Sequence, residues 1–283
     1  MLPGQPSRTM LRSAIRRAAH QILDDPIILI DPIVVDLVPE ASEPAIRDGL
    51  DGPGAPDARL LRYMFAMRSR FAEDRLADAT ARGVRQYVMI GAGLDTFPWR
   101  QPDFAKGIQI FAADHPASLM WTQERLRRHA LSRPANLTYV PADLEERRLG
   151  DHLLACGFDC RAASFCSALG VTQYLEAEAV GALFGFAATL PKSSELVFSF
   201  APLDDQSSAA GGHAFHHFGS GPAALGEPWK SRWRAADLVA QLADLGFRDV
   251  FHLTPELARQ RYFSDQPEIS ERAGWDHIIA AIV

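Results

Sequence analysis

The stretch RQYVMIGAGLDTFPWR, residues 85–100, decides the fold of this chain. Its apolar letters YVMI are typical of a strand buried in a parallel sheet, and they stop abruptly at Gly91, Ala92 and Gly93. Two glycines at the carboxyl end of a buried strand let the backbone turn sharply and let a ligand come close to it. Because Asp95 follows at once, we expect a polar hollow at the place where an open α/β sheet binds its ligand.

The next two predicted strands each lead to an acidic residue. The run 108–113 ends at Asp114, and the run 137–140 leads into Asp143 and Leu144. An acid at the tip of the second strand can accept both ribose hydroxyls of a nucleoside. An acid after the third strand can accept the exocyclic amine of an adenine while Leu144 packs on the ring. Glycines, a first acid and a second acid in this order predict a pocket for S-adenosylmethionine.

A nicotinamide-dependent oxidoreductase is the alternative enzyme class, because it shares the first strand and its glycines. The dinucleotide fingerprint G-x-G-x-x-G has a third glycine, and this chain has Thr96 at that position. The missing glycine and the pair Asp143-Leu144 argue against the oxidoreductase.

Four motifs of the chain resemble those of leucine carboxyl methyltransferases and their bacterial relatives, which include polyketide carboxyl methyltransferases and mycobacterial S-adenosylmethionine-dependent methyltransferases. The motifs are GAGLDTFPWR, AADHPASLMWTQERL, VPADLEE and ALGVTQYL, and the resemblance runs from about Arg12 to the C-terminus. It implies an α/β fold with a seven-stranded, doubly wound class I methyltransferase sheet (Rossmann-like) whose last strand is antiparallel. Counting apolar runs along the chain also gives seven strands, with helices between the early ones.

The resemblance implies further cofactor contacts. The family has an arginine in the segment RSRF that pairs with the carboxylate of S-adenosylmethionine, and a guanidinium fork suits that pairing. Arg68 is the predicted ligand, with Arg70 as second choice. The predicted cofactor-binding residues also include His115 and Leu169. His115 lies beside the presumed ribose ligand and is expected to have a structural role there, and Leu169 follows the fourth strand. Some relatives carry an acid where Leu169 stands, so we expect no catalytic acid from that segment.

Two regions fall outside the alternation of strands and helices. Residues 1–57 are predicted to form an N-terminal helical lid, and residues 58–283 the S-adenosylmethionine-binding methyltransferase domain. An insertion after the fifth strand, at about residues 202–232, mixes glycine, histidine and aromatic residues. A long insertion of this composition predicts a cap over the substrate.

The lid contains two predicted elements. Residues 8–23 read as a basic helix with an apolar side, and its Arg12, Arg16 and Arg17 are expected on a solvated face. The segment 27–38 is apolar but interrupted by an Asp-Pro pair, which recurs near the N-terminus of the resembled family. We expect that segment to pack over the cofactor pocket.

The chemistry of methyl transfer favours one kind of acceptor. Transfer from a sulfonium is an in-line displacement at carbon, so the protein mainly has to align donor and acceptor. A carboxylate acceptor, with a pKa of about 4, is ionised and needs no general base, whereas a hydroxyl acceptor does need one. No Ser-His-Asp arrangement or paired-carboxylate motif stands out, which favours O-methylation of a carboxylate.

Histidines in the insertion keep hydroxyl methylation open. His213, His216 and His217 could place an imidazole at a hydroxyl acceptor, and His216 is the base candidate. Tyr174 is the other catalytic candidate, since its hydroxyl could lie at the rim of the site, but it could equally be a core aromatic. A protein that binds the cofactor without methylating anything is a third hypothesis.

The composition limits partners and compartment. A net charge of −6 and an isoelectric point near 5.8 argue against a nucleic-acid or anionic membrane surface. Cys156, Cys160 and Cys166 are expected to be reduced, buried thiols, and their spacing predicts no metal site. Without an apolar run of transmembrane length or a secretory signal, the chain is expected in the cytoplasm. Its expected partner is a small-molecule acceptor such as a natural-product carboxylic acid, and the oligomeric state is left open.

Overall fold

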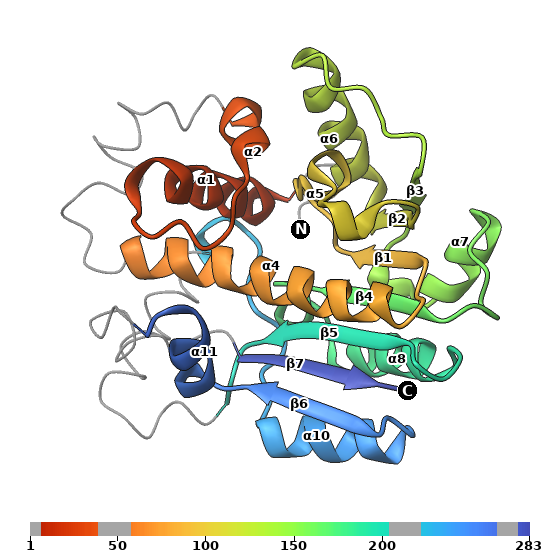
Figure 1. Cartoon of the computed structure of the whole chain (residues 1–283). Coiled ribbons are helices and arrows are strands. Elements are labelled where there is room, and N and C mark those ends of the chain that lie inside the picture. Colours follow the sequence, from red (N-terminus) through yellow and green to blue (C-terminus); the bar gives the residue numbers. More distant parts are fainter. Residues whose placement is uncertain (1–6, 39–57, 204–221, 265–276) are drawn as a thin grey trace.

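The computed structural model describes residues 7–38, 58–203, 222–264 and 277–283 of the 283-residue chain. These ranges contain one seven-stranded sheet between helices (Figure 1). The strands are β1 (Gln86–Ile90), β2 (Gln109–Asp114), β3 (Leu137–Pro141), β4 (Ser164–Ala168), β5 (Glu195–Phe200), β6 (Asp249–Leu253) and β7 (His277–Ile282).

The strand order across the sheet is β3-β2-β1-β4-β5-β7-β6. Strands β1 to β5 pair in parallel, and β7 pairs antiparallel with β5 and with β6. The chain moves from β1 to β2 and β3 on one side and then returns to β4 on the other. The carboxyl end of β1 therefore lies where the strand order reverses, which is where open α/β sheets bind ligands. This topology confirms the predicted class I methyltransferase sheet with its antiparallel last strand.

Helices cover both faces of the sheet. They are α1 (Arg8–Leu23), α2 (Pro32–Leu37), α4 (Ala58–Ala81), α5 (Phe97–Arg100), α6 (Pro116–Arg128), α7 (Leu149–Ala155), α8 (Ala177–Ala188), α10 (Ala235–Asp244) and α11 (Pro255–Tyr262), with short 3-10 turns η3 (Asp103–Ala105), η4 (Leu144–Glu146) and η5 (Thr172–Tyr174). In β1, Tyr87 and Met89 enter a core shared with α4, while Val88 and Ile90 enter a core shared with α7 and α8. A strand buried on both faces reads as a continuous apolar run.

The sequence predicts a fourth strand over 161–167, a helix over 145–156 and a sixth strand over 247–253, and the structure shifts the boundaries of each. Strand β4 begins at Ser164, later than expected, because a carboxylate oxygen of Asp159 accepts the N–H of Arg161 at 3.0 Å and holds a turn there. The predicted helix over 145–156 is split into η4 and α7, because Arg147 has a left-handed φ of 59° that no helix can contain. Strand β6 begins at Asp249, after the turn that closes α10.

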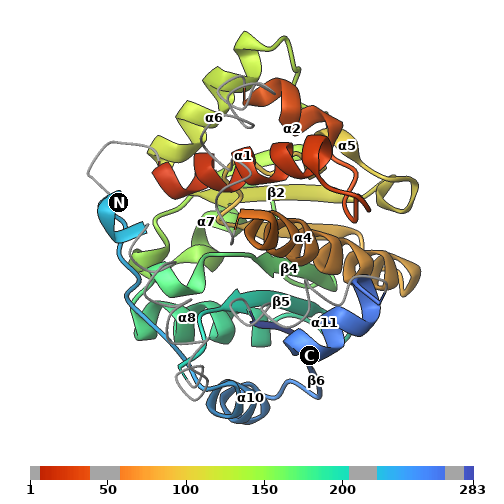
Figure 2. The same ribbon diagram turned by 90° about the vertical axis from the view of Figure 1, so that its left-hand side faces the viewer.

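The described part of the N-terminal segment, residues 7–38, lies over the carboxyl edge of the sheet. Figure 2, which faces this edge, shows α1 across it, beside α4. Apolar residues of α1 and α2 form a small core of their own with Leu94, which follows β1. The segment is therefore anchored on the loop that ends β1.

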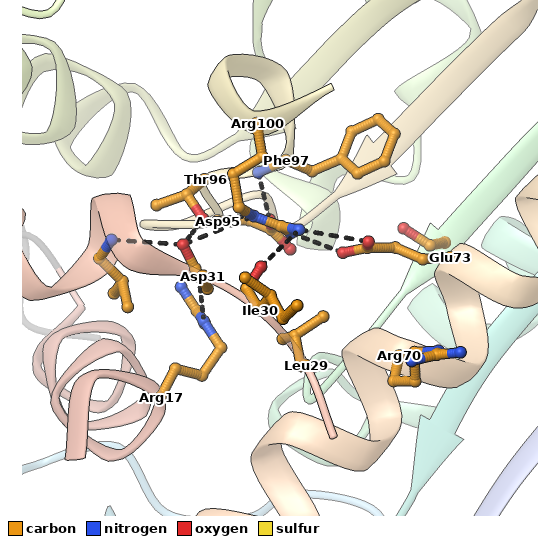
Figure 3. Close-up of polar contacts among 12 residues, drawn as sticks. Arg17, Leu29, Ile30, Asp31, Arg70, Glu73, Asp95, Thr96, Phe97 and Arg100 are labelled. Atoms are coloured by element: carbon orange, nitrogen blue, oxygen red, sulfur yellow. Dashed lines mark hydrogen bonds and ion pairs between the residues drawn. The ribbon is translucent and has the colours of Figure 1, made fainter. Parts of the chain in front are cut away.

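The predicted solvated face of α1 is correct only in part. Arg12 is exposed and Arg16 is half-buried, but Arg17 is buried. Its Nη2 donates to the carbonyl of Leu94 at 2.5 Å, and its Nε lies 3.5 Å from a carboxylate oxygen of Asp31 (Figure 3). Arg17 was misplaced because both partners, Asp31 and Leu94, lie outside α1, and the helical spacing within α1 does not show them.

A buried ion triad fastens α4 to β5. The side chain of Glu195 is fully buried at the start of β5 and accepts hydrogen bonds from Arg75 and, at 2.6 Å, from Arg82. Arg75 is 21% and Arg82 36% exposed. Water can therefore solvate the two guanidinium groups, whereas it does not reach the carboxylate.

Removing the two cations should destabilise the protein more than removing the anion. We expect Arg75→Ala with Arg82→Ala to lower the free energy of unfolding by about 3–5 kcal/mol, because Glu195 stays buried and unpaired. Glu195→Gln should cost at most about 2 kcal/mol. Urea unfolding measures both, with Arg128→Ala, from an exposed pair with Glu124, as a control within about 0.5 kcal/mol. The opposite order would contradict this account.

A histidine pair joins β6 to β7. The rings of His252 and His277 stack with centroids 4.9 Å apart, and Nε2 of His252 lies 2.8 Å from Nδ1 of His277. Burial lowers the pKa of each imidazole to about 4, whereas an unfolded histidine has a pKa of about 6.5. The folded protein therefore keeps both rings neutral in a range where the unfolded chain is protonated.

The free energy of unfolding should fall as the pH drops from about 6.5 to about 4, because in this range the histidines bind protons in the unfolded chain but not in the folded protein. Above about pH 6.5 the histidines are neutral in both states, so they no longer make the free energy of unfolding depend on pH. We expect His277→Asn to flatten the dependence of the free energy of unfolding on pH in this window, by at most about 1.4 kcal/mol per pH unit. Chemical unfolding at a series of pH values measures the slope. An unchanged slope would contradict the neutral pair.

Candidate active site

A cavity of about 900 Å³ opens at the carboxyl edge of the sheet. Its floor comes from the ends of β1, β2, β3 and β4, and its walls come from α1, α4 and residues 222–230. It lies at the topological switch point and has the size of ligand sites in other proteins. The predicted cofactor-binding residues all line it: Arg68, Gly91, Ala92, Gly93, Asp95, Asp114, His115, Asp143, Leu144 and Leu169.

The glycines of the β1 turn are required by their backbone and by their neighbours. Gly91 has a φ of 69° and Gly93 a φ of 55°, a region that favours glycine. A Cβ atom on Gly91 would lie 2.3 Å from Cγ2 of Val171, and one on Gly93 would lie 2.9 Å from Cγ of Met10. The turn therefore presents bare backbone to the cavity because no larger residue fits.

Asp114 ties the end of β2 to the glycine turn. One carboxylate oxygen accepts the N–H of Gly93 at 2.7 Å, and the other accepts the N–H of His115 at 2.7 Å. Burial raises the pKa of this carboxyl group. A carboxylate has about four acceptor sites, so two remain for ligand hydroxyls. Asp114, the predicted ribose ligand, lines the cavity.

The residues beyond Asp114 form the other predicted contacts. Nδ1 of His115 accepts the N–H of Ala117 at 3.1 Å and caps α6. Asp143 caps η4 by accepting the N–H of Glu145 at 3.0 Å. Leu144, the first residue of η4, lines the cavity next to it.

The structure separates the two candidate arginines. Arg68 is buried in the cavity wall, with its guanidinium 4.3 Å from the ring centroid of Phe65. A Cβ atom on Gly170 would lie 2.6 Å from Nη1 of Arg68, so this glycine makes room for the guanidinium. Arg70 is exposed and pairs with Asp74 at 2.7 Å. Of the two, Arg68 is the one that lines the cavity.

Tyr174 also lines the cavity but is not suited to be a base. Burial raises the pKa of its phenol, and hydrogen bonding to Trp229 and Thr9 only partly offsets this effect. The phenol is therefore protonated at neutral pH. The other catalytic candidate, His216, lies outside the described residues together with His213 and His217.

The sequence analysis did not predict that Arg16, Phe65 and Glu227 line the cavity. Arg16 of α1 lies with its guanidinium 5.5 Å from the ring of Phe65 on α4. Glu227 accepts hydrogen bonds from the side chain of Ser7 and from the backbone and hydroxyl of Thr9, at 2.6–3.1 Å. Residues 61, 65 and 68 of α4 lie on one helix face because of their spacing. This spacing was the sequence signal that could have placed Phe65 beside Arg68 in the cavity wall.

The described residues hold no group of three or more histidine, cysteine or acidic side chains that could bind a metal ion. Cys166 is buried, and burial raises the pKa of its thiol to about 12. The expectation of three buried thiols is wrong for Cys160, which is exposed in the turn before β4, and for Cys156, which is half-buried. None of the helices in the described ranges is both long enough and apolar enough to span a bilayer.

Comparison with known proteins agrees with the geometry. A model of the family described as leucine carboxyl methyltransferase matches residues 10–188. YktD of Bacillus subtilis (strain 168), whose name provisionally calls it an S-adenosyl-L-methionine-dependent methyltransferase, is 28% identical over 303 residues, covering 100% of this chain and 99% of YktD. A Mycobacterium avium (strain 104) protein with the same provisional description is 33% identical over 188 residues, covering 62% of this chain and 59% of that protein.

Solved structures show the same fold. A duf574 family protein from Streptomyces avermitilis superimposes with a TM-score of 0.59 at 17% identity, covering 95% of this chain and 96% of that one. A Thermobifida fusca protein, provisionally named a methyltransferase, gives 0.58 at 16% identity, covering 100% and 97%. Because the family model matches more than half of the chain, the protein belongs to the leucine carboxyl methyltransferase family and is a methyltransferase.

Proposed function

We propose that this methyltransferase transfers the methyl group of S-adenosylmethionine to a carboxylate of a small organic acceptor. The cofactor part of the proposal is supported by the relatives, YktD among them, whose names give this methyl donor. It is also supported by the cavity, in which all the predicted cofactor ligands meet.

The residues of the cavity fit the parts of the cofactor. Asp114 has acceptor sites left for the ribose hydroxyls, and Asp143 with Leu144 can hold the adenine. The buried Arg68 can pair with the carboxylate of the methionine part. When bound, S-adenosylmethionine supplies a methyl group on a positive sulfur that is already a good leaving group. The chain then has to hold donor and acceptor in line.

One observation supports a carboxylate acceptor more than any other. Two guanidinium groups, of Arg16 and Arg68, approach the same ring of Phe65 at 5.5 and 4.3 Å inside one cavity. One of these cations can pair with the cofactor's carboxylate, and the other can contact an anion on the acceptor. Leu61 and Met64 line the same wall and would contact the carbon skeleton of the acceptor.

The acid–base groups agree with this acceptor. A carboxylate is already ionised at neutral pH, and a nearby guanidinium lowers its pKa further. Tyr174 is protonated and offers no base. Glu227 already accepts hydrogen bonds from the first turn of α1, which occupy its oxygens. A carboxylate needs neither group to remove a proton. A natural-product carboxylic acid with an apolar skeleton fits this wall.

A glycine substitution tests the cofactor pocket. Gly91→Ala should abolish binding of S-adenosylhomocysteine, because its Cβ atom would meet Val171 and push the turn into the cavity. Gly246→Ala is the matched control, since Gly246 also has a positive φ but no atom within 4 Å of the new Cβ. Both changes cost about 1 kcal/mol of backbone strain. Calorimetry should show binding only for wild type and Gly246→Ala. Equal affinity of all three proteins would refute the pocket assignment.

A charge substitution tests the acceptor anchor. Arg16→Gln should raise the KM for a carboxylic acid acceptor about ten-fold or more, because a charge-assisted hydrogen bond is lost, and should leave the affinity for S-adenosylhomocysteine unchanged. Arg8→Gln, on the same helix but outside the cavity wall, is the control. The assay follows tritiated methyl transfer to aromatic and aliphatic carboxylic acids, with their amides and the matching phenols as comparison.

The product distinguishes the acceptor groups. A methyl ester releases its label as methanol in alkali, whereas a methyl ether keeps it. Label that resists alkali would indicate hydroxyl methylation and a base such as His216, and would overturn the carboxylate assignment.

A further inference from the structure

A buried carboxylate lies where the N-terminal segment meets the loop after β1. The side chain of Asp31 is 1% exposed and precedes α2, whose N-terminus it caps by accepting the N–H of Val34 at 3.2 Å. Figure 3 shows Asp31 between α1, α2 and the residues around Thr96. Asp31 does not line the cavity.

Asp31 binds the loop that carries the cofactor ligands. We call residues 91–96 the cofactor loop. The hydroxyl of Thr96, which is fully buried, donates to Oδ1 of Asp31 at 2.6 Å. Asp95, the residue before Thr96, lines the cavity. A shift of Asp31 would therefore move a residue that is adjacent to a predicted cofactor ligand.

Arg17 of α1 contacts both Asp31 and the cofactor loop. Its Nε lies 3.5 Å from Oδ2 of Asp31, and its Nη2 donates to the carbonyl of Leu94 in the cofactor loop at 2.5 Å. The next residue towards the N-terminus is Arg16, which lines the cavity. The contacts that fix the loop also fix the helix that carries Arg16.

Arg100 completes the network from α5. Its guanidinium pairs with Glu73 of α4 at 2.5 Å, its Nε donates to Oγ1 of Thr96 at 3.1 Å, and the same Nε lies 3.4 Å from Oδ1 of Asp31. The side chains of Arg100 and Glu73 are 9% and 13% exposed. In such a buried network, loss of one charge leaves its partners uncompensated.

We propose that Asp31 is a positioning residue that couples docking of the N-terminal segment to the geometry of the cofactor loop. The cofactor touches the loop, and Asp31 holds the loop to α1 and α2. A cofactor that favours the docked loop must therefore favour the docked segment, and docking must favour the cofactor by the same factor. The inference rests on the cofactor part of the proposed function and is independent of the acceptor.

Hydrogen exchange of the wild-type protein tests the coupling directly. Saturating S-adenosylhomocysteine should slow amide exchange about ten-fold or more in the buried parts of α1 and α2, residues 14–20 and 34–37, relative to the free protein. Calorimetry in the same buffer establishes saturation. Binding without added protection in these helices would overturn the coupling alone, whereas absence of binding would contradict the proposed function as well.

Two substitutions then separate positioning from stability. Asp31→Asn should weaken S-adenosylhomocysteine binding about ten-fold and remove the protection of α1 even at saturation. Asp36→Asn removes an exposed carboxylate of α2, the helix that Asp31 caps, and should behave as wild type. Wild-type affinity and protection in Asp31→Asn would overturn the proposal.

The threonine gives an independent comparison in case Asp31→Asn does not fold. Thr96→Val removes the hydroxyl that donates to Asp31 with little change of volume, and Thr96→Ser keeps it. We expect Thr96→Val to bind S-adenosylhomocysteine about ten-fold more weakly without protecting α1, and Thr96→Ser to restore both. A purely structural role would lower the melting temperature of Thr96→Val but leave the ligand-dependent protection intact, and that result would refute the coupling.

Discussion

The left-handed turn at Gly91 is the constraint on which the site depends. Its N–H donates to the carbonyl of Ala113 at 2.8 Å, and Gly93 donates to the side chain of Asp114. The end of β1 is thus bound to the end of β2 by backbone and carboxylate together. Val171, from the segment after β4, packs where a Cβ atom would stand. The turn brings the tips of three neighbouring strands to one point.

Much of the fold could be predicted because its signals are local. Strand β5 and helix α11 begin and end where the sequence predicts a strand over 195–200 and a short helix over 255–262. The boundaries that moved depend on single backbone conformations, such as the left-handed Arg147 that ends η4. Neither apolar periodicity nor residue type reports that conformation, because arginine is not a residue that favours it.

The site was predictable to the extent that topology determines it. Parallel strands put their carboxyl ends at one edge, so residues that follow strands, Asp114 and Asp143 among them, had to meet there. Arg16 and Phe65 belong to two different helices, α1 and α4. Which face of each helix lines the cavity depends on how the two helices pack, and the sequence of one helix does not determine that packing. Glu195 and Arg17 show the same limit for buried charges. The partners of Glu195 lie 113 and 120 positions away, and the carbonyl that Arg17 contacts lies 77 positions away.

Buried charge and apolar packing hold the N-terminal segment in different ways. The apolar contacts of α1 and α2 with Leu94 supply affinity for the sheet edge, but they tolerate small shifts of the helix. Asp31, Arg17 and Arg100 accept few geometries, because each hydrogen bond is directional and each charge is costly when unpaired. An in-line displacement is sensitive to displacements of about 1 Å. Because α1 also carries Arg16, the proposed acceptor wall is complete only when α1 is docked, so in the proposed reaction the acceptor would be aligned by the same contacts that hold the cofactor loop.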